Sequence, residues 1–168
     1  MGLLDNLLNR NPTRDWQPQR GLELVVDLDR ESFCGVRLGE KVERLHKFGP
    51  TADAASARIG MFNYPTRGFQ VSEEQGKFVE VETTFGEGDG ARAFAGKVVR
   101  RGRSKVFTGE NGEADLVQLL GPPSERKERL AEEDSPAGVT MLWRLVNTDF
   151  TADFEDGRLS VLWLGTKQ

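Results

Sequence analysis

Residues 38–50 read LGEKVERLHKFGP, and this stretch decides how the rest of the chain is interpreted. Apolar residues recur in it at helical spacing, at Leu38, Val42 and Leu45, which predicts a helix over residues 39–48. Gly49-Pro50 ends that helix, because glycine accepts the left-handed cap conformation and proline cannot continue the hydrogen-bond ladder.

A similar pattern lies in the second half, where residues 114–122 read ADLVQLLGP and predict a helix over residues 112–120. Seven positions after the first Gly-Pro have counterparts after the second, in one register. Phe62, Tyr64, Phe69, Glu74, Gly76, Lys77 and Phe78 match Trp143, Leu145, Phe150, Glu155, Gly157, Arg158 and Leu159. Such internal similarity predicts a tandem repeat.

Each predicted helix is followed by segments that alternate apolar and polar residues, which is typical of strands with one wet face. We expect strands near 58–64, 68–72 and 77–85 in the first half, and near 140–147, 150–154 and 158–164 in the second. Tight turns at 74–77 and 155–158 join the last two strands of each set, and further strands are expected near 22–28 and 91–99. The charged stretch 123–138 is expected to be a loop or a solvated helical excursion.

The predicted fold class is therefore α+β, a tandem repeat of one helix plus antiparallel strands that form a curved sheet, preceded by a short N-terminal helix. The expected organisation is an N-terminal amphipathic helix and linker over 1–20, a first helix-plus-sheet repeat over 21–90 and a second over 91–168.

Composition narrows the function classes. The 168 residues are 37% hydrophobic and 30% charged, which is ordinary for a globular protein. A formal net charge of -4 disfavours nucleic acid as a partner. One cysteine and one histidine exclude an internal disulfide and make a zinc site hard to assemble, so we expect no metal and no cofactor.

Four leucines near the N-terminus form one apolar stripe of a short helix: Leu3, Leu4, Leu7 and Leu8. The segment has no basic start and is too short for a secretory signal or a membrane span, so a cytoplasmic location is expected. Insertion of these leucines would make the protein a peripheral membrane or docking adaptor, which is the alternative hypothesis.

No group of residues predicts catalysis. Cys34 and His46 are the obvious nucleophile and base, but nothing in their spacing brings them together, and both suit a structural role. Glu80 and Glu82 fit a wet sheet face better than an acid/base pair. The glycine run at 86–90 fails the spacing of a phosphate-binding loop, and the basic residues at 100–105 suit a solvated turn. A small-ligand carrier or an enzyme of unrecognised class stays as a third hypothesis.

Aromatic residues on the predicted strands are the better candidates for binding: Phe62, Tyr64, Trp143 and Trp163. Tryptophan and tyrosine are favoured interface anchors because they bury a large area at low entropic cost. If the sheet face that carries them is open, it is a binding surface; if a helix covers it, these residues are core. The leading prediction is a non-enzymatic protein–protein interaction module that uses an aromatic sheet face.

The two halves resemble the fold shared by the beta-lactamase inhibitory protein and the small outer-membrane lipoprotein of the barrel-assembly machinery. The resemblance covers about residues 35–164 and rests on these positions: Leu38-Gly39, Val42, Leu45, Gly49-Pro50, Tyr64, Gly76, Leu120-Gly121-Pro122, Trp143 and Gly157. It implies two sheets joined into a curved surface that clamps another protein with aromatic side chains, and no catalytic residues. The lipobox cysteine, signal peptide and disulfides of those proteins have no counterpart here, so only the fold and the habit of binding proteins are carried over.

Overall fold

Two sheets share one hydrophobic core in the computed structural model, which describes residues 11–51, 53–86, 90–131 and 136–167. The fold is α+β, as the sequence predicts. The smaller sheet has the order β3-β2-β1-β7-β8, from strands β1 (Val25–Asp27), β2 (Ser32–Phe33), β3 (Val36–Arg37), β7 (Lys97–Arg100) and β8 (Arg103–Val106). Its strands pair antiparallel except for β1 with β7.

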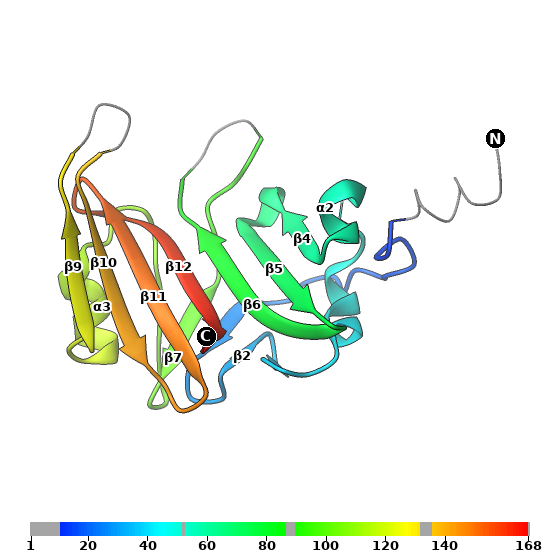
Figure 1. Ribbon diagram of the computed structural model, residues 1–168, viewed down its shortest axis with the longest axis horizontal. Helices are drawn as coiled ribbons and strands as arrows, with labels where there is room; N and C mark the ends of the chain where they lie inside the picture. Colours follow the sequence, from blue (N-terminus) through cyan, green and yellow to red (C-terminus); the bar gives the residue numbers. More distant parts are fainter. Residues whose placement is uncertain (1–10, 52, 87–89, 132–135, 168) are drawn as a thin grey trace.

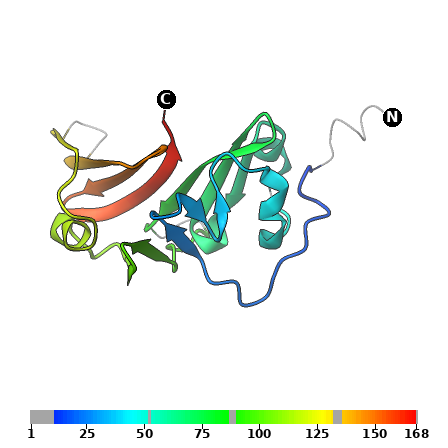
Figure 2. The same ribbon diagram turned by 90° about the horizontal axis from the view of Figure 1, so that it is seen from below.

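The larger sheet is antiparallel throughout, with seven strands in the order β4-β5-β6-β12-β11-β10-β9. These strands are β4 (Met61–Tyr64), β5 (Phe69–Glu74), β6 (Lys77–Thr84), β9 (Glu125–Arg129), β10 (Gly138–Arg144), β11 (Thr148–Glu155) and β12 (Arg158–Thr166). Figure 1 shows this sheet in front, with β2, β7 and helix α3 (Glu113–Leu120) behind it. The smaller sheet and helix α3 therefore lie on one face of the larger sheet, and Figure 2 shows them beneath it.

Both sheets take strands from each half of the chain. In the larger sheet β6 pairs with β12, from Thr84 opposite Val161 to Glu80 opposite Gly165. In the smaller sheet β1 pairs with β7. The expected segments 21–90 and 91–168 consequently share both sheets and one core.

The helices agree in part with the prediction. Helix α3 lies where the second helix is expected. The first expected helix is a 3-10 helix, η1 (Val42–Phe48), which begins three residues later than predicted. A short 3-10 turn, η2 (Pro65–Arg67), follows β4.

A short helix, α2 (Ala54–Arg58), forms within the small-residue stretch after Gly49-Pro50. Asp53 caps it, because its carboxylate accepts bonds from the backbone N–H groups of Ala55 and Ser56, both at 3.0 Å. The first expected strand, placed at 58–64, accordingly begins only at Met61.

Four strands escape the prediction, namely β2, β3, β8 and β9, and β7 begins late. The charged stretch 123–138 contains β9, so the expectation of a loop or helix there is wrong over Glu125–Arg129. The pairs β2–β3 and β7–β8 include the unpredicted strands β2, β3 and β8. Strand β7 begins at Lys97, because the residues before it cross the backbone of Gly68: a Cβ there would lie 2.3 Å from the N atom of Phe94.

The two predicted tight turns are present and share one conformation. Gln75 and Gly76 both have positive φ angles, 52° and 75°, and Asp156 and Gly157 have 49° and 78°. Two successive positive φ angles define the two-residue hairpin turn that matches the twist of the strands. A bulge follows each turn, since the register shifts between Ser72 and Glu73 and between Asp153 and Phe154.

Candidate functional site

Three of the four predicted aromatic anchors lie in the core. Phe62, Tyr64 and Trp143 are only 3%, 6% and 6% exposed, respectively. Alternating burial along β4 and β10 puts them on the face of the larger sheet that packs in the shared core. The expectation that they form an open aromatic surface therefore needs correcting: a partner cannot reach them on this structure.

Tyr64 and Trp143 hold the ends of two helices. The Tyr64 hydroxyl donates to the carbonyl oxygen of Gly49 at 2.8 Å, and the Trp143 indole N–H donates to that of Gly121 at 3.0 Å. Burial raises the pKa of the Tyr64 hydroxyl, so it stays a neutral donor. These polar contacts satisfy carbonyl groups that a helix end leaves without partners.

Trp163 is the fourth predicted anchor and lies on the opposite face. Its neighbours along β12, Leu162 and Leu164, are both 1% exposed in the core, so alternation directs Trp163 to the opposite face, which no helix or second sheet of the described residues covers. We call this face, on strands β5, β6, β12 and β11, the open face. A Cβ on Gly165 would lie 2.6 Å from Cζ2 of Trp163, so the half-buried indole lies along its own strand over that glycine.

Acidic residues flank Trp163 on both sides. Strand β6 contributes Glu80 and Glu82, of which Glu82 lies directly opposite Trp163 in the pairing register. On the other side β11 contributes Asp149 and Asp153 to the same face, beside Thr151, the partner of Trp163. The expectation that Glu80 and Glu82 mark a sheet face rather than an acid/base pair agrees with their place here.

The surroundings of Glu82 disfavour the charged form of its carboxyl group. Partial burial, and then repulsion from Glu80 and Asp153, raise the pKa of its carboxyl group. Within the described part of the chain, no side chain donates a hydrogen bond or an ion pair to the Glu82 carboxylate. The open face therefore holds negative charge that the fold itself does not neutralise.

A pocket adjoins Glu82 on the side of β4 and β5. It has a volume of about 370 Å³, and its polar lining comes from the open face of three strands and from the cap of α2. These polar residues are Asp53, Asn63, Gln70, Glu82 and Thr84. The pocket extends the acidic surface away from Trp163, toward Asp53.

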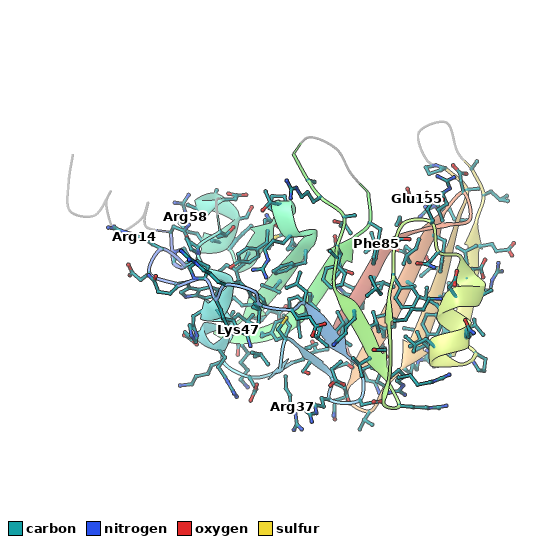
Figure 3. The ribbon with its side chains drawn as sticks, turned by 180° about the vertical axis from the view of Figure 1, so that it is seen from behind. Arg14, Arg37, Lys47, Arg58, Phe85 and Glu155 are labelled. Atoms are coloured by element: carbon teal, nitrogen blue, oxygen red, sulfur yellow. The ribbon has the colours of Figure 1, made fainter. Side chains whose placement is uncertain are left out.

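Several basic residues lie away from β12. The labelled side chains Arg14, Lys47 and Arg58 lie at the end of the molecule that carries η1 and α2 (Figure 3). The predicted basic cluster at 100–105 makes structural contacts. Arg100 donates to the carbonyl of Leu28, Arg103 to that of Leu119, and Lys105 to the Asp115 carboxylate.

Cys34 and His46, the candidate nucleophile and base, lie in places that suit a structural role. Cys34 lies in the turn between β2 and β3, with a positive φ of 50°, and burial raises the pKa of its thiol, which disfavours a nucleophilic thiolate. His46 lies in η1, where its Nδ1 is 3.0 Å from the carbonyl oxygen of Glu43. Among the described residues, no hydrogen bond joins the two side chains: the Cys34 thiol faces the carbonyl of Glu23, and the His46 ring faces that of Glu43.

The N-terminal leucines Leu3, Leu4, Leu7 and Leu8 lie outside the described residues, as do residues 87–89 of the glycine run. Over the described ranges, no cluster of three or more His, Cys, Asp or Glu side chains is arranged to hold a metal ion. In the same ranges, no helix has the length and apolar character needed to cross a membrane.

The sequence predicts Trp163 as a binding residue, together with three residues that lie in the core. It does not predict that the acidic residues of β11 lie beside Trp163. The signal was present, because residues 148–154 read TDFTADF and place polar residues at every second position. The alternation along the sequence does not show which strands are adjacent. Strand β12 lies beside β6 through a pairing between residues far apart in the chain.

Comparisons with protein-family models, with curated proteins and with solved structures find no match for this chain. The open face is therefore the feature from which a function is inferred.

Proposed function

We propose that the protein is a non-enzymatic interaction module whose open face binds a cationic segment of another protein. One observation carries the proposal: Trp163, half-buried and uncovered by any element that the structure describes, lies between Glu82 on one strand and the acidic strand β11 on the other. This keeps the predicted role for an aromatic sheet face but assigns it to the other face of the sheet, with Trp163 as its anchor.

The chemistry of this surface favours arginine or lysine side chains. A guanidinium or ammonium group over an indole gains cation–π attraction, which strengthens as water is excluded. Glu82 would then supply a charge-assisted hydrogen bond, and binding would relieve its repulsion from Glu80 and Asp153. Arginine is the better fit because its planar group can stack on the ring and bond a carboxylate at once.

A defined peptide tests the proposal. Uniformly 15N-labelled protein is titrated with tetra-arginine, and with tetra-glutamate as the peptide of opposite charge, while amide and indole resonances are followed by NMR. We expect tetra-arginine alone to shift the Trp163 indole resonance and the amides of β6, β11 and β12. Equal shifts from both peptides, or shifts confined to other strands, would overturn the proposal.

Variants locate the binding. Trp163→Ala and Glu82→Gln should each weaken tetra-arginine binding by about three- to tenfold, the range expected for one cation–π contact or one charged contact. Glu74→Gln makes the same charge change at the exposed end of β5, and should leave the affinity unchanged. A loss of affinity as large for Glu74→Gln would mean that only the net charge matters.

The natural partner can then be sought with matched baits. Wild-type protein and Trp163→Ala are immobilised and exposed to lysate of the source organism, and retained proteins are identified by mass spectrometry. The relevant partner is retained by the wild type only and is released by tetra-arginine. A partner retained equally by both baits would belong to another surface.

We also infer that the fold arose by duplication of one helix-plus-hairpin unit. Supporting it are the bonds of Tyr64 to Gly49 and of Trp143 to Gly121, and the shared turn and bulge of the two hairpins. Tyr64 lies opposite Phe69, and Trp143 lies opposite Phe150. The strand pairing therefore makes Trp143 the counterpart of Tyr64. The alignment of the two halves of the sequence makes it the counterpart of Phe62.

A further inference from the structure

Strand β9 forms one edge of the larger sheet, and within the described ranges the side away from β10 has no strand beside it (Figure 1). Four of its five residues are exposed, and the first is half-buried. An uncovered edge presents unpaired backbone groups that can pair with another strand, and charged side chains usually discourage such pairing. Residues 125–129 of this strand read Glu-Arg-Lys-Glu-Arg. In this order the charges favour pairing with a second copy of the strand in one antiparallel register.

Antiparallel pairing of two copies of β9 about Lys127 places opposite charges against each other. Glu125 then faces Arg129 of the second copy, and Arg126 faces its Glu128, with each pair occurring twice by symmetry. Directly opposite residues of an antiparallel pair project to the same face, so these charges are in reach of each other. Lys127 facing its own copy is the one pair of like charges.

Other alignments lack this complementarity. Parallel pairing in register would set each charge against its own copy. Shifting the antiparallel register by one residue sets either Glu125 against Glu128 or Arg126 against Arg129. The order of charges therefore opposes those competing arrangements and permits the one centred on Lys127.

Contacts within the chain hold several of these side chains along the strand. Arg126 donates to the Glu113 carboxylate of α3 at 2.7 and 3.0 Å and also bonds Glu128, while Glu125 receives Arg144 and, at 3.6 Å, Lys127. Because these contacts already fix side chains that would face the second copy, less conformational entropy is lost on pairing. In the pair they would extend into one network of charges across both strands.

We propose that two copies of this chain associate through β9, antiparallel and centred on Lys127, so that their larger sheets become continuous. The association is isologous and closes with two-fold symmetry, because each copy uses the same strand. Two five-residue edges form a small interface, so a weak dimer is expected, with a dissociation constant of about 10 to 100 micromolar. This proposal is independent of what the open face binds.

Sedimentation velocity on the full chain tests it, between about 5 and 500 micromolar, a range that spans a weak equilibrium. The wild-type sedimentation coefficient should rise with concentration, and about 0.5 M salt should reduce the rise because it screens exposed charges. Arg129→Glu sets two like-charged pairs against Glu125 and should weaken association about tenfold. Glu125→Lys should do the same, by setting lysines against Arg129.

Mixing the two variants gives the decisive result. In a mixed pair, Glu at position 129 of one copy faces Lys at position 125 of the other, and the remaining pair keeps Glu125 against Arg129. Association should therefore return when equal amounts of Arg129→Glu and Glu125→Lys are combined. Arg20→Glu, at an exposed position far along the chain, is the matched control and should associate as the wild type does.

Circular dichroism and thermal unfolding establish that each variant is folded before it is compared. A wild type that stays monomeric over the whole range would overturn the proposal. So would association that Arg129→Glu leaves unchanged, because the dimer would then use another surface, and so would a mixture that associates no better than its components.

Discussion

The hydroxyl of Tyr64 donates a hydrogen bond to the carbonyl oxygen of Gly49, fifteen positions earlier, at 2.8 Å. Both residues are buried, and Gly49 has a φ of 78° at the end of η1. The bond joins the end of η1 to β4. If the Tyr64 hydroxyl is removed, the Gly49 carbonyl group loses this donor.

Replacing Tyr64 with phenylalanine keeps the ring and deletes this donor. Because the buried Gly49 carbonyl would lose its side-chain partner, Tyr64→Phe should lower the free energy of unfolding by about 1 to 2 kcal/mol. Urea denaturation followed by circular dichroism measures this change. An unchanged free energy would mean that the carbonyl finds another donor.

The two tryptophans of the larger sheet should respond differently to truncation. Trp143→Ala removes a core side chain and a hydrogen bond to Gly121, and should cost about 3 to 5 kcal/mol. Trp163→Ala removes a half-buried side chain from the open face, and should cost less than about 2 kcal/mol. Thermal unfolding of both variants decides; equal losses would place Trp163 in the core.

Gly68 and Gly76 have similar backbone angles but different surroundings. Both have positive φ, 70° and 75°, so alanine at either site incurs backbone strain of about 1 to 2 kcal/mol. Only at Gly68 would the new Cβ also collide with backbone, 2.3 Å from the Phe94 N atom and 2.6 Å from the Arg92 carbonyl oxygen. Gly68→Ala should therefore destabilise the protein clearly more than Gly76→Ala, as measured by denaturant unfolding of the two variants side by side.

The pH dependence of stability should reveal Glu82. Burial and neighbouring acids raise the pKa of its carboxyl group on folding, so the folded state binds the proton more tightly than the unfolded state does. This disfavours folding above the ordinary glutamate pKa, and the penalty fades at lower pH, where the group is protonated in both states. Glu82→Gln should consequently unfold at a higher temperature than the wild type at pH 7, with a difference that shrinks toward pH 3.5.

The control for that experiment is Glu74→Gln, which should leave the melting temperature at pH 7 nearly unchanged. A Glu82→Gln variant less stable than the wild type at pH 7 would show that the carboxylate is held by a favourable contact.

Asp115 should show the opposite dependence. Its carboxylate accepts bonds from Lys105 at 2.5 Å and from the backbone N–H of Gly112 at 3.0 Å, and these partners, Lys105 first, lower its pKa to about 2. Its contribution is present above the ordinary aspartate pKa and is lost as the pH falls toward 2. Asp115→Asn should therefore be less stable than the wild type at pH 7, by under about 1 kcal/mol because the pair is partly exposed, and the difference should vanish below about pH 2.

The sequence predicted those elements whose cause is local. Helix α3 and both tight turns follow from neighbouring residues, namely the apolar spacing before Gly121 and the glycines at 76 and 157. Strand β9 was missed because its five charged residues carry no apolar alternation, and only pairing with β10 makes it a strand. Strands β2 and β3 were missed because two residues are too few for a periodic pattern.

The candidate site was predictable to a smaller extent. Alternation along β12 shows that Trp163 and Leu162 face opposite ways, but not which face is covered. The same limit explains Phe62, Tyr64 and Trp143, whose aromatic character suits a core and an interface equally well. Covering is decided by how β1, β7 and the helices pack, which depends on contacts between residues far apart in the chain.

The pairing of β6 with β12 has a consequence for synthesis of the chain on the ribosome. Strand β6 is made well before β12, which follows every other strand, so the outer edge of β6 waits uncovered while its neighbour is still untranslated. A nascent or truncated chain without β12 would hold two separate pieces of sheet, each with an open edge able to recruit strands from other molecules. Pairing of β12 with β6 is thus the step that joins these two pieces into one continuous sheet and covers the edge of β6.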